Sequence, residues 1–122
     1  MTIQECYQKL GGDYTQAKKR LSNDLIISKF IEKFLDDKSF CELCYAMQEG
    51  QRKQAFCAAH TLKGVCANLS FNKLLTSVSL LTDLLRPETD EICEDAFLNT
   101  EQVKKDYDLT VGAIREYLGL AD

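Results

Sequence analysis

The chain has 122 residues, of which 45% are hydrophobic and 28% are charged, and its net charge is -4. This length suits one domain that buries a continuous core without metals or disulfides, and the composition is too balanced for a disordered tail. Phosphate backbones are bound through clustered lysine and arginine, so the acidic balance argues against nucleic acid as a partner.

The sequence gives no sign of membrane insertion or export. No run of about 18 apolar residues is present, so no segment is expected to span a bilayer. The first residues lack the basic and then apolar pattern of a signal peptide, and we therefore expect a cytoplasmic protein. Six cysteines lie mostly in helical, apolar-patterned segments. This favours reduced, mostly buried thiols over a disulfide scaffold.

The pattern of the chain predicts an all-α fold. There is one proline among 122 residues, and no segment shows the sustained alternation of a half-buried strand. Residues 1–20 are expected to form a short N-terminal helical extension. Ser22 or Asn23 is then expected to cap a helix that bends at 36–39 and ends at Gly50.

Three further helices are expected, over residues 51–69, 72–85 and about 90–118. Pro87 cannot continue the second of these, and Thr89 or Asp90 is expected to cap the last. Long amphipathic helices with short connections favour an antiparallel, up-down-up-down four-helix bundle over 22–118. We therefore expect a single domain that comprises residues 1–122.

The helix over 51–69 carries the one histidine of the chain, His60. With about 100° per residue and Leu62 at the centre of the apolar face, His60 lies about 160° away from that centre. Its side chain should therefore point outward. Four residues share its side of the helix at spacings of three, four and seven: Lys53, Lys63, Gly64 and Ala67.

His60 and two of the residues on its side of the helix suit phosphoryl chemistry. An exposed imidazole such as that of His60 is a nitrogen nucleophile, substantially neutral at pH 7, that can accept a phosphoryl group. Lys63 can offset the added negative charge. Gly64 costs a helix about 1 kcal/mol relative to alanine, and its missing side chain can admit a partner's active site.

Small and apolar residues surround the histidine on the expected outward face: Phe56, Ala67 and Phe71. A purely solvated face would be more charged, so this face is interpreted as a docking patch for another protein. The opposing interpretation is an ordinary surface histidine, with Gly64 at a close helix crossing and Lys63 merely solvated. The pattern alone favours neither.

The helix also contains a run that resembles the His-x-Leu-Lys-Gly motif of histidine phosphotransfer (HPt) domains: His60-Thr61-Leu62-Lys63-Gly64. The likeness extends to chain length, to a four-helix bundle and to the place of the motif in the second bundle helix. It implies that His60 is phosphorylated, that Lys63 assists, and that Gly64 gives access to a receiver domain. The family commonly has glycine where this chain has Ser70, which leaves open how the helix ends.

The resemblance implies a phosphocarrier without catalytic activity of its own, which moves a phosphoryl group through His60 between receiver-domain aspartates. The expected partners are response-regulator receiver domains and a hybrid histidine kinase, with Mg²⁺ supplied by the receiver. The chain itself is expected to hold no cofactor or metal and to act as a monomer. No glycine-rich nucleotide loop is visible in the sequence.

Two alternatives remain for the same helix. A histidine kinase also presents histidine on a helical bundle, but such kinases place an acidic residue after it, where this chain has Thr61. A helical adaptor could use Phe56 and Phe71 to bind a signalling partner without phosphorylation. The carrier requires His60 chemically, whereas the adaptor should tolerate glutamine there.

Cys41 and Cys44 have the Cys-x-x-Cys spacing that zinc and redox sites use. They lie in a helical pattern with Leu43 and Met47, and no second pair follows. Packing at the core or its boundary is therefore favoured over a metal or redox role.

Overall fold

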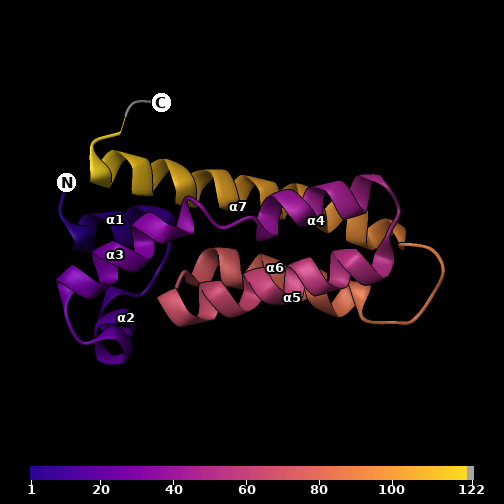
Figure 1. Cartoon of the computed structure of the whole chain (residues 1–122), viewed down its shortest axis with the longest axis horizontal. Helices are drawn as coiled ribbons and strands as arrows, with labels where there is room; N and C mark the ends of the chain where they lie inside the picture. Colours follow the sequence, from indigo (N-terminus) through magenta and orange to yellow (C-terminus); the bar gives the residue numbers. More distant parts are fainter. Residues whose placement is uncertain (121–122) are drawn as a thin grey trace.

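The computed structural model describes residues 1–120, and within them it contains seven helices and no strand (Figure 1). The all-α prediction is confirmed, and the last two residues of the predicted domain 1–122 lie outside the described residues. In chain order the helices are α1 (Ile3–Leu10), α2 (Tyr14–Leu21), α3 (Asp24–Phe34), α4 (Ser39–Gln48), α5 (Arg52–Leu69), α6 (Asn72–Leu85) and α7 (Glu94–Leu118).

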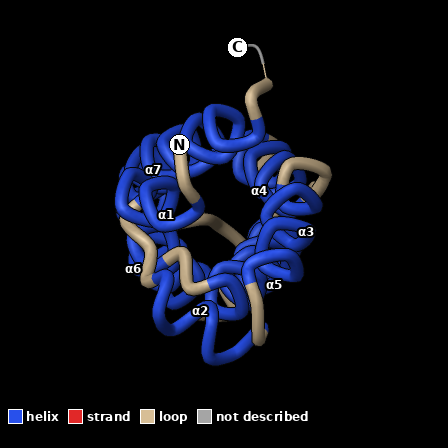
Figure 2. The backbone as a smooth tube through the Cα atoms, turned by 90° about the vertical axis from the view of Figure 1, so that its left-hand side faces the viewer, coloured by secondary structure: helices blue, strands red, loops and turns tan. Residues whose placement is uncertain are grey.

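The core lies between α4, α5, α6 and α7, each of which packs against the next along the chain (Figure 2). Leu43, Leu62, Leu81 and Ile114, one from each of these helices, are completely buried. Burial of a leucine or isoleucine side chain contributes about 1.5–3 kcal/mol relative to exposure. The structure is therefore a helical bundle stabilised by one shared apolar interior.

The N-terminal segment is part of this core, whereas the sequence suggested an extension beside it. Helix α1 packs along α7 (Figure 1). It buries Ile3, Cys6, Tyr7 and Leu10, and the Tyr7 hydroxyl donates a hydrogen bond to the carbonyl oxygen of Leu69 at 2.8 Å. This bond ties α1 to the end of α5.

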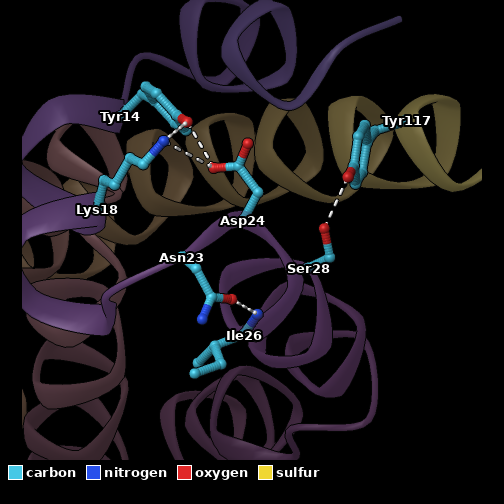
Figure 3. A network of polar contacts seen from close by, with 7 residues as sticks. All are labelled: Tyr14, Lys18, Asn23, Asp24, Ile26, Ser28 and Tyr117. Atoms are coloured by element: carbon cyan, nitrogen blue, oxygen red, sulfur yellow. Dashed lines mark hydrogen bonds and ion pairs between the residues drawn. The ribbon is translucent and has the colours of Figure 1, made fainter.

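The helix predicted to bend at 36–39 is broken into α3 and α4. The carboxylate of Asp37 accepts a hydrogen bond from the backbone N–H of Ser39 at 2.9 Å. Short polar side chains of this kind compete with helical hydrogen bonding. The predicted cap at Asn23 is confirmed, because its side chain accepts the N–H of Ile26 at 2.9 Å (Figure 3).

Two polar contacts hold α3 against its neighbours (Figure 3). The Tyr14 hydroxyl of α2 donates a hydrogen bond to the Asp24 carboxylate, near which the Lys18 ammonium also lies. The hydroxyls of Ser28 and Tyr117 share a hydrogen bond of 2.7 Å that links α3 to α7. The first turns of α3 are therefore connected to α2 and to the last turn of α7.

The last helix begins at Glu94, so the predicted cap at Thr89 or Asp90 is wrong. The Thr89 hydroxyl donates to the carbonyl oxygen of Glu91 at 2.7 Å, within the loop. Arg52 at the start of α5 donates to the carbonyl oxygens of Thr89 at 2.8 Å and Leu85 at 2.7 Å. These bonds hold the chain after α6 as a loop.

The end of α5 depends on an arginine from α2. Ser70 follows the helix with φ of 56°, in the left-handed region that favours glycine. Arg20 donates hydrogen bonds to the carbonyl oxygens of Ala67 and Asn68 and to the Ser70 hydroxyl. The last carbonyls of a helix lack partners within the helix, so Arg20 acts as their cap.

Replacement of this cap is expected to destabilise the fold. Arg20→Ala should lower the free energy of unfolding by about 1–2 kcal/mol, because hydrogen bonds from a charged donor are lost while water can still reach the exposed Ala67 and Asn68. Urea denaturation followed by circular dichroism measures the change. Lys19→Ala, an exposed neighbour on α2, is the control, and an equal loss there would contradict the capping role.

The cysteines are free thiols, but fewer are buried than predicted. Cys6 and Cys66 are buried, whereas Cys41, Cys57 and Cys93 are exposed and Cys44 is half-buried. Burial raises the pKa of the Cys6 thiol to about 11 and that of the Cys66 thiol to about 12. The prediction that most of the thiols are buried is therefore wrong, because Cys41, Cys57 and Cys93 are exposed.

Alkylation should separate the two classes of thiol. Iodoacetamide at neutral pH is expected to modify Cys41, Cys57 and Cys93 within the native state, and Cys6 and Cys66 only after unfolding. The reason is that the thiolate is the reactive form, and a raised pKa and burial both suppress it. Timed labelling with peptide mass spectrometry measures this order. Modification of Cys66 as fast as Cys57 in the folded protein would contradict it.

Candidate functional site

Helix α5 presents two different faces. Its inward face is fully or almost fully buried and consists of Ala55, Ala58, Ala59, Leu62, Cys66 and Leu69. His60 is exposed on the other side. The prediction that its imidazole points away from the core is therefore confirmed.

The residues predicted to share this face are brought together on it. Lys53, Gly64 and Ala67 are exposed, and Lys63 is half-buried one turn after His60. We call these residues, with His60, the His60 face. All of them come from one helix, which explains why helical spacing alone located them.

Gly64 has no packing role in the free chain. A Cβ atom added at this position would meet no other atom within 4 Å. The alternative in which Gly64 permits a close helix crossing is therefore wrong. Glycine makes the helix less stable than alanine would, although the space at this position would hold the alanine methyl group.

Two further side chains are linked to His60 by ring contacts: Phe56 of α5, and Arg86 at the end of α6. The ring of Phe56 is stacked with the imidazole, with centroids 5.9 Å apart and an interplanar angle of 22°. The guanidinium carbon of Arg86 lies 5.3 Å from the centroid of the Phe56 ring. Arg86 follows α6, so no local pattern in the sequence could connect it with His60.

Phe71 does not belong to the His60 face, and its predicted place in a docking patch is wrong. It is completely buried, with its ring centroid 5.2 Å from that of Phe34 and 5.7 Å from that of Tyr7. The helical projection fails because α5 ends at Leu69 and the left-handed Ser70 redirects the chain. Phe71 thus enters the core.

Two hollows open along the other flank of the His60 face. A groove of about 730 Å³ between α4 and α5 is lined by residues that include Cys57, Lys53 and Thr61. A smaller hollow of about 210 Å³ between α3 and α5 is lined by residues that include Phe30 and Asn68. The His60 face is therefore bordered by recessed surface from two other helices.

Within residues 1–120 there is no group of three or more histidine, cysteine, aspartate or glutamate side chains that could hold a metal ion. Cys41 lines the α4–α5 groove, whereas Cys44 lines a different hollow beside α7. The Cys-x-x-Cys spacing therefore does not direct both thiols to one hollow. In the described part of the chain no helix is long and apolar enough to cross a membrane.

Comparisons of the chain with protein-family models, with curated proteins and with solved structures return no match. The features of the chain that bear on function are therefore its own residues. Two of these features are the run from His60 to Gly64 and the exposed face of α5 on which His60 and Gly64 lie, with open space at the Gly64 Cβ position.

Proposed function

We propose that this protein is a histidine phosphotransfer protein, in which His60 carries a phosphoryl group between receiver-domain aspartates. One observation carries the proposal: α5 combines an exposed imidazole, a lysine one turn later and a glycine with open space above it. The matching motif, His60-Thr61-Leu62-Lys63-Gly64, resembles that of HPt domains.

The proposed reaction is a reversible displacement at phosphorus. A neutral imidazole nitrogen of His60 attacks the aspartyl phosphate in line with the leaving carboxylate. The N–P bond forms as the acyl P–O bond breaks, and the second ring nitrogen keeps its proton. Lys63 offsets the negative charge that His60 acquires. Such transfer depends on positioning and charge neutralisation, and the receiver contributes Mg²⁺ and the remaining groups.

The surroundings of His60 support docking of a folded partner. Gly64 leaves open space one turn after the imidazole, and a hollow lined in part by Phe30 and Val65 lies between α3 and α5. Leu25, Ile26 and Phe30 are exposed apolar side chains of α3. Exposed apolar surface of this kind is typical of protein interaction sites where it forms a contiguous patch.

We also propose a bundle topology, an oligomeric state, a location and partners for the protein. The scaffold is an antiparallel four-helix bundle in which the broken pair α3 and α4 acts as the first helix. The protein functions as a monomer in the cytoplasm, without autonomous catalysis, between receiver domains and a hybrid histidine kinase.

The direct test is label transfer from a phosphorylated receiver domain. Wild-type protein is expected to acquire acid-labile, base-stable label, and His60→Gln none, because only the imidazole can form the N–P bond. His60 is exposed, so circular dichroism should show an unchanged fold in the variant. Binding of one receiver by both proteins without label on either would overturn the carrier function and favour the adaptor.

The glycine provides a second test with a matched control. Gly64→Ala and Gly112→Ala should each raise the free energy of unfolding by about 1 kcal/mol, because both glycines lie inside helices and have open space at the Cβ position. Only Gly64→Ala should slow transfer from a receiver, by roughly one to two orders of magnitude, because its methyl group intrudes on the docked partner. Chemical denaturation and labelling rates measure the two effects. Equal transfer rates in both variants would contradict the access role.

A further inference from the structure

Two contacts link the imidazole of His60 to Phe56 and Phe56 to Arg86, and we call these three side chains the stack. Phe56 is half-buried one turn before His60, and its ring lies 5.9 Å from the imidazole at an interplanar angle of 22°. The guanidinium of Arg86 lies 5.3 Å from the Phe56 ring centroid. The stack joins the end of α6 to the middle of α5.

The chain on both sides of Arg86 is fixed to α5. Arg52 donates hydrogen bonds to the carbonyl oxygens of Leu85 and Thr89, which precede and follow Arg86. The Arg86 guanidinium itself donates to the Asp83 carboxylate at 3.3 Å. Arg86 is therefore anchored near Phe56 by contacts that do not involve His60.

An exposed histidine side chain otherwise samples several staggered rotamers. An offset aromatic contact favours the stacked orientation by roughly two- to tenfold over the others. A guanidinium near the ring centroid stabilises the position of Phe56 in turn, because the ring face attracts a cation. The stack therefore restricts the imidazole before any partner arrives.

We propose that Phe56 is a positioning residue for the phosphoacceptor and that Arg86 holds Phe56 in place. This inference rests on the proposed function of His60. A nucleophile that is already oriented loses less conformational freedom when it meets a phosphoryl donor held in a docked receiver, which raises the rate of transfer. The role of Phe56 is then distinct from docking, since it acts on His60 even when no receiver is present.

Transfer from a saturating receiver separates positioning from docking, and a small phosphoryl donor is the control for the reactivity of the imidazole. With phosphoramidate, the P–N bond of the donor breaks, ammonia leaves, and the imidazole nitrogen forms the new N–P bond. Phosphoramidate can approach an exposed imidazole from any direction, so Phe56→Leu should keep a rate of this labelling close to that of the wild type. With saturating receiver, Phe56→Leu is expected to slow transfer two- to tenfold without a change in receiver affinity, and Arg86→Gln should slow it to a smaller extent. Phe56→Tyr keeps the ring and Arg86→Lys keeps the cation, so both should retain a rate close to that of the wild type.

Nuclear magnetic resonance gives a readout that does not depend on phosphorylation. The chain has one histidine, so its imidazole C–H signals are unambiguous. The Phe56 ring current should displace these signals in the wild type and in Phe56→Tyr. In Phe56→Leu they should move towards the values of a free histidine, while circular dichroism shows an intact fold.

The outcomes are distinguishable. Slower transfer at saturating receiver, with unchanged receiver affinity and shifted imidazole signals in Phe56→Leu, would support positioning. Weaker receiver binding by Phe56→Leu, with a wild-type rate of transfer at saturating receiver, would make Phe56 a docking contact and overturn positioning alone. A wild-type protein that accepts label from neither donor would overturn the proposed function and the positioning role with it.

Discussion

The structure depends on the burial of one face of α5. Small side chains at Ala55, Ala58 and Ala59 let the neighbouring helices approach closely, and Leu62 fills the space between them. Rotation of α5 about its axis would expose Leu62 and drive Lys63 towards the core, where an unpaired charge is strongly unfavourable. The exposure of His60 is thus a consequence of how the opposite face packs.

Helical periodicity was sufficient to predict α6 and, to within one residue, α5, because each carries a regular apolar stripe. The same reasoning failed where contacts between distant residues decide the backbone. Ser70 adopts a left-handed conformation beside Arg20 and turns Phe71 into the core. The hydrogen bonds from Arg52 likewise hold the chain after α6 as a loop, beyond the predicted cap of the last helix. No local pattern contains either contact.

In the candidate site too, residues of one helix could be predicted from the sequence, whereas a residue from another part of the chain could not. His60, Lys63 and Gly64 could be grouped from sequence because they belong to one helix. The sequence left two interpretations of Gly64, and the open space at its Cβ position removes the one based on helix packing. Arg86 could not be found, because only the fold brings the end of α6 near the Phe56 ring.

The two flanks of His60 differ in a way that suits a carrier. On the α6 side, Phe56 and Arg86 form the stack with His60. The Arg52 hydrogen bond to the carbonyl oxygen of Leu85 fixes the backbone next to Arg86. On the α3 and α4 side, the surface is recessed beside Phe30 and Cys57. A carrier must present the same imidazole to a donor and then to an acceptor. Under the proposed function, the stack keeps the nucleophile in one orientation, while the recessed flank is free to receive either partner.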